Sequence, residues 1–462
     1  MELHGRHTIT TDEKIITDDN VVSVLDNAYI KHVVNREEEK YLYDYYRGRQ
    51  AIRLKVKATR PEINHIVVEN RCLAIVDFKT GYICGDPIIY TSRSQEKVKN
   101  DNIQKLNGMM LYENKEALDK DLFDWLHITG HGYRMILPGT DNPFEITVLE
   151  PFNTFVVYDN THKKNPIMNV YYVTDENGER TYSVYTKDAF YVIKDSKIVS
   201  KEDNYMGLPI IEYKLNSAMM GAFESVISLL DAINFLDSDR LDGVTSFVNS
   251  LCVLYNAELP EGEDGNTIRA KGLITLKSVG ENKADIKIMA EQLDQTSTQN
   301  LKDDLYNSVL QIVGMPNQSS DADSSNNGAM FLKQGYQLAE TRAKDTELMF
   351  KKAEREALKL VLRCLSYQKD PNERMDIPLF DIDITFTRRA YTDIVSKSTV
   401  LATMLGNEKV APIDAWTLSG ITPDPDEACR RGLEWYEKNA DADRRTEQSG
   451  NENKVSIEKG TE

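Results

Sequence analysis

Residues Gly207–Phe247 have the sequence GLPIIEYKLNSAMMGAFESVISLLDAINFLDSDRLDGVTSF. From Phe223 onward, apolar residues recur mostly at steps of three and four positions, which is typical of one face of an α-helix. This pattern predicts a single helix from Phe223 to Tyr255, roughly 50 Å long at 1.5 Å per residue. The apolar residues of the predicted face are Val226, Leu229, Leu230, Ile233, Leu236 and Leu241.

The residues that follow predict a second helix. The segment ELPEGEDGN (258–266) is too rich in Gly and Pro to continue the first helix. Beyond it we expect two short strands, Gly272–Leu276 and Ala284–Met289, and then a helix from Leu293 to Val313 that Pro316 terminates. Two long helices with a small β-rich module at their tip indicate a hairpin arm rather than a catalytic pocket.

A polar loop and a third long helix come next. The loop, Gln318–Gly328, is rich in Ser, Asn and Asp, and the helix is expected over Ala329–Cys364. A strand is predicted over Asp381–Phe386. From about Ala440 the sequence is polar and charged with almost no apolar anchors, so we expect residues 441–462 to be disordered. Two further helices are expected at Ile394–Leu405 and Pro425–Lys438, joined by the Pro- and Gly-containing segment Val410–Thr422.

The N-terminal half changes from helical to strand periodicity near Tyr133. Residues 1–20 are expected to be flexible, and the next 200 residues to form helices that cover a mixed sheet. The Asn-Gly pair within Asp175–Arg180 predicts a β-hairpin. The predicted helices are Val21–Tyr46, Ile63–Gly85 and Asn114–His127, and the predicted strands are Tyr133–Leu137, Thr154–Tyr158, Val170–Val173 and Tyr182–Tyr185. The fold class is therefore α+β.

Composition restricts the function. The chain has 462 residues and a net charge of −18, without clustered Lys and Arg, so tight non-specific binding of DNA is not expected. Passage of DNA along an acidic wall remains possible, because repulsion prevents adhesion. The five cysteines are scattered and lack C-x-x-C spacing, which predicts free thiols in a reducing compartment. No apolar run approaches the roughly 20 residues that span a bilayer, and the polar N-terminus is unlike a signal peptide.

Two motifs resemble known types of metal site. His127 and His131 have a spacing that could bind zinc on a helix, but Gly130 between them indicates that the helix has ended, so a structural role is favoured. The sequence DADSSNNG (321–328) begins like a calcium loop, yet lacks the Gly and Glu that such a loop requires at its sixth and twelfth positions. No metal or other cofactor is therefore expected.

A nuclease is the enzymatic alternative. Asp381 and Asp383 lie two positions apart on the predicted strand, hence on one face, where paired carboxylates could hold a metal ion. No accompanying Glu-x-Lys or His arrangement is visible nearby, so solvation or an ion pair between subunits is the better interpretation. The sequence contains no G-x-x-x-x-G-K-[ST] motif, which argues against a P-loop motor.

Four segments resemble elements of phage portal proteins, of the family found in long-tailed phages of Gram-positive bacteria. They are YLYDYYRGRQAI (41–52), NHIVVENRCLAIVDFKTGYICGDPIIY (64–90), the stretch Gly207–Phe247 quoted above and FDIDITFTRR (380–389). The third is similar to a family element of the form (G/R)xPxIEY…GxFExVxxLIDAYDxLxSD. Each motif is moderately specific, but all four occur in the order in which the family has them.

The resemblance implies a portal fold and a ring, dodecameric in the family, through which DNA enters and leaves the capsid. It also implies that the chain is not an enzyme, and that it acts in the virion at the portal vertex after assembly in the host bacterial cytoplasm. The parts it implies are an α/β wing (21–222), a two-helix stem (223–255 and 293–316), a small α/β clip (256–292), a tunnel loop (317–328), a long wing helix with a strand (329–393) and a short helical crown (394–440).

The implied partners are further copies of the chain, the terminase large subunit, the head-to-tail adaptor, the major capsid and scaffolding proteins, and double-stranded DNA that passes without tight binding; no membrane is involved. The tunnel-loop residues would be Gln318, Ser319, Ser320, Asp321, Asp323, Ser324, Ser325, Asn326 and Asn327. The clip surface that meets partners would comprise Glu261, Glu263, Asp264, Arg269, Lys271, Lys277, Glu281 and Lys283. A soluble adaptor that binds through residues 256–292 is the non-enzymatic alternative.

Overall fold

The computed structural model describes residues 5–58, 61–93, 97–248, 251–255, 257–258, 277–278, 285–289, 295–317, 335–367, 375, 377–387, 394–407, 409–422 and 424–439. The chain divides into two compact units. The larger unit comprises Met1–Tyr43, Leu73–Ser225 and Val313–Glu462, and the smaller unit comprises Asp44–Cys72 and Val226–Ile312.

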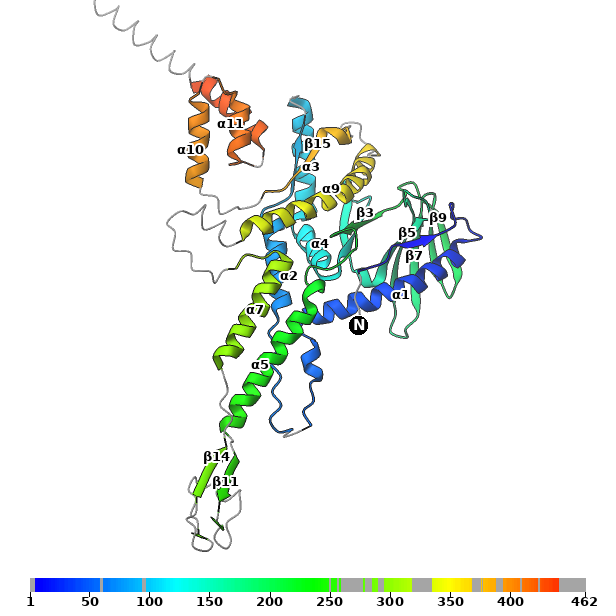
Figure 1. Ribbon diagram of the computed structural model, residues 1–462. Coiled ribbons are helices and arrows are strands. Elements are labelled where there is room, and N and C mark those ends of the chain that lie inside the picture. The colour runs from blue at the N-terminus through cyan, green and yellow to red at the C-terminus, as the bar shows by residue number, and fades with distance from the viewer. Residues whose placement is uncertain are drawn as a thin grey trace, which may run out of the picture. The chain divides into compact units, whose positions relative to one another are not determined.

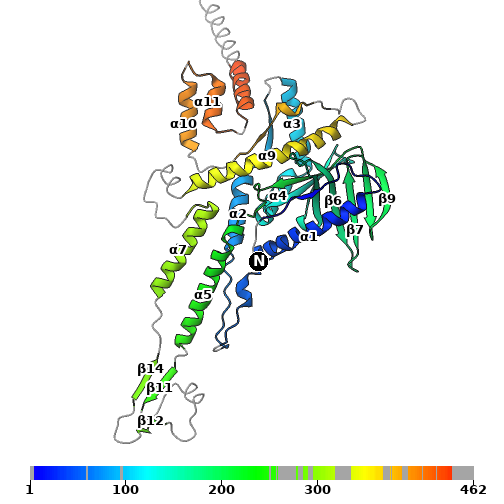
Figure 2. The same ribbon diagram turned by 45° about the vertical axis from the view of Figure 1, so that its right-hand side comes forward.

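A six-stranded sheet with the strand order β1-β5-β6-β7-β8-β9 forms one layer of the larger unit. Helix α1 (Val21–Tyr46) lies across one face of this sheet, as both ribbon views show (Figures 1 and 2). Val21, Val24, Leu25 and Ala28 of α1 pack against buried residues of the central strands. The strands are β1 (Ile9–Thr11), β5 (Thr154–Asp159), β6 (Pro166–Thr174), β7 (Arg180–Thr186), β8 (Ala189–Lys194) and β9 (Lys197–Asp203). The hairpin predicted at Asp175–Arg180 joins β6 to β7, with Thr174 opposite Arg180.

A second core surrounds helix α9 (Tyr336–Ser366), which carries the large apolar residues Phe350, Leu358 and Val361 on its buried face. It packs against α3 (Lys97–Tyr112), α4 (Lys115–Thr129) and two small sheets. One sheet has the order β10-β3-β4, and the other pairs β15 with β2. Their strands are β2 (Ile89–Ser92), β3 (His131–Leu137), β4 (Glu145–Leu149), β10 (Ile210–Lys214) and β15 (Ile382–Thr385). Helix α9 thus lies where the third long helix was predicted.

The N-terminal segment differs from the expectation of a flexible residue 1–20 region. Strand β1 pairs in parallel with β5, placing Ile9 opposite Val157. Arg6 is buried and forms an ion pair with Glu224 at 2.8 Å. The described part of this segment is held by these contacts, because burial of Ile9 is favourable and the buried charge of Arg6 requires its carboxylate partner.

The described part of the smaller unit contains two long α-helices and an extended strap. Helix α5 spans Ile227–Val248 and helix α7 spans Gln295–Val313, and they run side by side in both views (Figures 1 and 2). The strap, defined here as residues 55–58 and 61–70, follows a short 3₁₀ helix at Ala51–Leu54. Beyond α5, strand β11 (Leu251–Tyr255) pairs antiparallel with β14 (Asp285–Met289). Ala257–Glu258 (β12) pairs with Lys277–Ser278 (β13).

Two of the helices predicted from the sequence are longer than the helices in the structure. The helix predicted from Phe223 to Tyr255 is α5 alone, and Leu251–Tyr255 is a strand, because its apolar residues are paired with Ile286 and Ile288 of β14. Strand β14 lies within the predicted strand Ala284–Met289 and pairs with β11, whereas the other predicted strand, Gly272–Leu276, lies outside the described residues. The helix predicted over Ile63–Gly85 begins only at Arg71, as α2 (Arg71–Cys84). Its first eight residues belong to the extended strap.

The C-terminal helices α10 (Ile394–Leu405) and residues 425–439 lie where they were predicted. The segment Val410–Thr422, expected only to join them, contains a third helix, α11 (Pro412–Ser419). Pro412 occupies the first turn of α11, where a missing N–H costs nothing and the fixed φ of proline suits a helix. Gly420 ends it in the left-handed conformation, with φ 57°. The tail predicted at 441–462 lies outside the described residues.

Candidate channel and docking surfaces

The residues predicted to line the tunnel, Gln318–Asn327, all lie outside the described residues. So do the predicted clip residues, with the exception of Lys277, whose backbone belongs to β13. Both segments extend from helices that the structure describes, α5 and α7. Side chains of α5 and α7 contact the strap.

A ladder of three hydrogen bonds joins the strap to α5. The backbone N–H groups of Glu69, Val67 and His65 donate to the side chains of Asn234, Ser238 and Asp242, respectively, at 2.8, 3.0 and 2.7 Å. The three acceptors are spaced four residues apart on α5 and are buried. Four helical residues rise about 6.0 Å, while two extended residues advance roughly 6.6–6.8 Å, so alternate strap residues meet successive turns of the helix.

This ladder explains why the strap is extended rather than helical. A helix over residues 63–70 would direct those N–H groups to its own carbonyls, so the three buried side chains on α5 would lose these backbone donors. Sequence reasoning missed the ladder. The available signal was the four-residue spacing of the polar residues at positions 234, 238 and 242.

Asp242 is also the centre of a charge cluster. Its carboxylate forms ion pairs with Lys55 at 2.9 Å and with Lys57 at 3.3 Å, and it contacts His65 Nδ1 at 2.8 Å. Burial opposes ionisation of Asp242, but the hydrogen bonds from His65, Lys55 and Lys57 outweigh it and hold the pKa of this carboxyl below its usual value. The strap is therefore anchored at one end by charge and along its length by backbone hydrogen bonds.

Helix α7 is joined to both neighbours through Lys302. Its ammonium group contacts Asp237 of α5 at 2.8 Å and Glu69 of the strap at 3.1 Å. Arg71 lies over the ring of Tyr306, 3.4 Å from the ring centroid. Together these contacts form a three-part assembly of helix, strap and helix, in which residues of opposite charge meet at partly buried positions.

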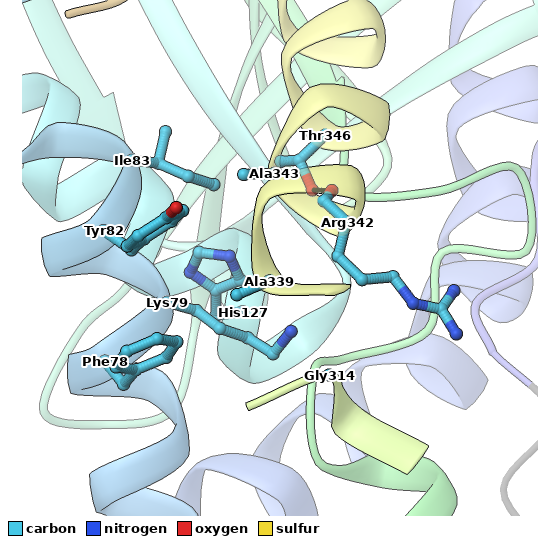
Figure 3. Close-up of a pocket in the computed structure, with 10 residues that line it drawn as sticks. All are labelled: Phe78, Lys79, Tyr82, Ile83, His127, Gly314, Ala339, Arg342, Ala343 and Thr346. Atoms are coloured by element: carbon cyan, nitrogen blue, oxygen red, sulfur yellow. Dashed lines mark hydrogen bonds between the residues drawn. The ribbon is translucent and has the colours of Figure 1, made fainter. Parts of the chain in front are cut away.

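A small pocket lies beside the end of α7, next to Gly314, which is four residues before Gln318 (Figure 3). Its volume is about 20 Å³, which is room for about one water molecule. Figure 3 shows Lys79 extending from α2 towards Gly314, with His127 of α4 beside it. The lining residues are Phe78, Lys79, Tyr82, Ile83, His127, Gly314, Ala339, Arg342, Ala343 and Thr346. They include no carboxylate and no thiol, so the pocket is too small and chemically too sparse for a substrate.

The polar groups of this pocket form hydrogen bonds within the fold. Lys79 Nζ donates to the carbonyl of Val313, the last residue of α7, at 2.7 Å. Burial and the nearby Arg342 lower the pKa of Lys79 to about 8. Burial and Lys79 lower the pKa of His127 to about 3, so its ring is neutral and shares a hydrogen bond with Thr80 at 3.0 Å. A cation at a helix C-terminus is favourable, because unpaired carbonyls gather there.

A buried charge cluster fixes α9 in the larger unit. Glu354 of α9 contacts Arg134 of β3 at 2.8 Å and Lys115 of α4 at 3.3 Å, and it accepts hydrogen bonds from Tyr90 and Tyr213. Arg134 also pairs with Asp119. Burial opposes the ionisation of Glu354, but Lys115 and Arg134 lower its pKa to about 2. Two acids and two bases thus share one dry site, which neutralises the buried charges.

A second buried cluster surrounds His131. Its ring contacts Glu39 of α1 at 2.8 Å and Glu212 of β10 at 3.3 Å. Burial alone would lower the pKa of His131, but the two carboxylates raise it to about 9. His127 and His131 therefore belong to separate structural clusters and do not form one site. Among the described residues, no group of three or more His, Cys, Asp or Glu could hold a metal ion.

Asp381 and Asp383 do not form a paired carboxylate site. Asp381 lies in a short 3₁₀ turn before β15 and is buried, whereas Asp383 lies on β15 and pairs with Arg93 at 3.0 Å. Arg93 also donates its backbone N–H to the carbonyl of Asp381. The sequence favoured solvation or an ion pair between subunits, whereas the structure pairs Asp383 with an arginine of the same chain. Within the described ranges, no helix is both long and apolar enough to cross a membrane.

Comparison with known proteins identifies the class. The sequence model of the family described as "Phage portal protein, SPP1 Gp6-like" matches residues 29–439, so the chain belongs to this family of phage portal proteins. It is a structural protein of the virion rather than an enzyme, and it associates with the capsid as an oligomeric ring. The predicted portal fold of the α+β class is thereby confirmed. No curated protein matches the sequence.

Two solved structures are similar to the chain. One is entitled "Neck of empty GTA particle computed with C6 symmetry", with 12% identity, a TM-score of 0.43, and coverage of 76% of this chain and 90% of that chain. The other is entitled "Virion of native gene transfer agent (GTA) particle", with 13% identity, a TM-score of 0.42, and coverage of 76% and 89%.

Proposed function

We propose that about twelve copies of the chain form the ring at the capsid vertex, and that double-stranded DNA passes through its channel during packaging and ejection. Membership of the portal family carries this proposal. A head-to-tail interface between identical copies generates a closed ring when its rotation fits a whole number of copies. The ring assembles in the host cytoplasm before the DNA is packaged.

In this proposal the smaller unit supplies the stem and the clip. The stem consists of α5, α7 and the strap, which the ladder at residues 234, 238 and 242 holds together. The clip includes the strand pair β11–β14 beyond α5. It docks the terminase large subunit during packaging and the head-to-tail adaptor afterwards, through the charged residues predicted between Glu261 and Lys283. Capsid and scaffolding proteins contact the ring outside the stem.

The tunnel loop at residues 317–328 meets the DNA. Its residues are mostly small and uncharged, with Asp321 and Asp323 as exceptions. Such a lining gives phosphates little to bind, since salt-dependent attachment to DNA requires Lys or Arg. The double variant Asp321→Lys/Asp323→Lys should form normal rings but package DNA more slowly, with the defect relieved as salt concentration rises. Asp321→Asn/Asp323→Asn, which removes charge without adding attraction, is the matched control.

Electron micrographs of the purified chain test the ring directly. Class averages should show rings of about twelve subunits with a central hole. A monodisperse monomer at every salt concentration, in micrographs and in light scattering, would contradict the proposal. The same preparations answer the adaptor alternative, which requires partner binding through residues 256–292 without a ring.

A further inference from the structure

A basic cleft opens in the larger unit between the β5–β6 turn and α9. Its volume is about 630 Å³, and it is separate from the pocket beside Gly314. Met349, Lys352, Glu356 and Lys359 face it from α9, at the three- and four-residue steps of one helix face. Lys163 and Lys164 of the β5–β6 turn face it from the opposite side, and Lys214 belongs to β10.

The charge of the cleft is opposite to that of the chain. Five lysines and two glutamates line it, a formal surplus of three positive charges, whereas the whole chain carries −18. Two of the lysines already have partners, since Lys214 pairs with Glu212 at 3.0 Å and Lys359 pairs with Glu356 at 2.6 Å. Lys163, Lys164 and Lys352 form no ion pair with any residue that the structure describes. They are exposed, so each can form an ion pair with a carboxylate of another molecule.

Part of the lining is apolar, which distinguishes a protein ligand from nucleic acid. This part, named the floor here, consists of the buried Val156, Ile210 and Ala353 with Ile211 and Met349, and the exposed Lys163, Lys164 and Lys352 are named the rim. DNA phosphates bind Lys, Arg and backbone N–H groups and gain nothing from such a floor. The volume is that of a site for a small ligand or a few side chains. A peptide segment that carries carboxylates beside an apolar side chain satisfies both the rim and the floor.

We infer that this cleft receives an acidic segment of a neighbouring copy of the chain, and so forms part of the contact between subunits of the proposed ring. Copies that each carry −18 repel one another overall. A stable contact must therefore place a local positive patch against negative residues, and electrostatic complementarity of this kind fixes register between partners. The chain has segments of the required chemistry, for example Glu202 and Asp203 close to the exposed Tyr205.

Cross-linking of the unmodified ring tests this inference, which rests on the proposed function. Copies grown with ¹⁴N and with ¹⁵N are mixed before assembly and treated with a carbodiimide, which joins lysines to carboxylates in direct contact. Mass spectrometry should find Lys163, Lys164 or Lys352 joined to a carboxylate on a copy of the other isotope. Rings whose cleft lysines are joined only to residues of their own copy would overturn the inference and leave the ring intact. If no ring forms, both proposals fail.

Charge reversal gives an independent measurement. The double variant Lys163→Glu/Lys352→Glu should require more than ten times the protein concentration for ring formation in sedimentation velocity. Lys187→Glu/Lys197→Glu, which changes one exposed lysine between β7 and β8 and one at the start of β9 by the same charge, should assemble like the parent protein. Thermal unfolding of both variants checks that they fold. Equal assembly of the cleft variant and the parent would show that another partner, not a second copy, occupies the cleft.

Discussion

Ser238 Oγ accepts a hydrogen bond from the backbone N–H of Val67 at 3.0 Å and donates one to the carbonyl of Asn234 at 2.8 Å. One buried hydroxyl therefore joins the strap to its own helix. We expect Ser238→Ala to leave the Val67 N–H without its acceptor, at a cost of about 1–3 kcal/mol. Hydrogen exchange should accelerate at residues 65–69. Thr245→Ala removes a hydroxyl that bonds within α5, and should leave exchange in the strap unchanged.

Asp242→Asn should weaken the charged end of the strap. The amide keeps the shape of the side chain but loses the ion pairs with Lys55 and Lys57, so we expect a loss of about 2 kcal/mol at neutral pH. Because the pKa of Asp242 is lowered in the folded protein, its stabilisation is present above about pH 4 and is lost on acidification. Melting temperatures of parent and variant should therefore converge below pH 4. A constant difference down to pH 2 would contradict this explanation.

Glu354→Gln tests the buried cluster that fixes α9. Removing one charge leaves Arg134 and Lys115 incompletely neutralised in a dry site, which typically costs about 3–5 kcal/mol. The apparent melting temperature should fall by several degrees. Glu356→Gln lies two positions away on the exposed face of the same helix, and should change stability by less than about 0.5 kcal/mol. Equal effects of the two variants would count against the structural role of the cluster.

His131→Gln should change the pH dependence of stability. The pKa of His131 is raised from its usual value near 6.5 to about 9, so the charged ring stabilises the fold below pH 6.5 and this contribution declines as pH rises to 9. The advantage of the parent over the variant should shrink by about 3 kcal/mol across this range. The measurement is urea unfolding at several pH values. His162→Gln, at an exposed loop position, should show no such change.

The sequence predicts local periodicity well and long-range partners poorly. Helices α1, α7 and α9 and the β6–β7 hairpin follow from patterns within a few residues. Strand β11 does not, because LCVLY at 251–255 continues the apolar pattern of α5, and only its partner β14, 30 residues later, makes it a strand. Tyr90 and Glu354 are hydrogen-bonded across 264 positions of sequence, which no local pattern reveals.

At the candidate site, too, local periodicity could be predicted from the sequence but long-range partners could not. Apolar periodicity predicts the helical arm, but the apolar residues Ile66 and Val67 also favour a helix where the structure has the strap. The spacing of Asn234, Ser238 and Asp242 was visible in the sequence, yet its meaning depends on an extended partner from 165 to 177 positions earlier in the chain. The basic cleft could not be predicted, since its lysines come from a turn, a strand and a helix that only the fold brings together.

The number of hydrogen bonds in the ladder between the strap and α5 is limited by geometry. Each rung advances the helix by about 6.0 Å and the extended chain by roughly 6.6–6.8 Å, so the two drift apart by more than half an ångström per rung. Three straight rungs tolerate this drift, but many more would not unless one partner curved. Because the three acceptors are an amide, a hydroxyl and a carboxylate, a slip of one rung would also place His65 opposite Ser238 and remove it from Asp242. Short length and unlike acceptors together define a single alignment of strap and helix.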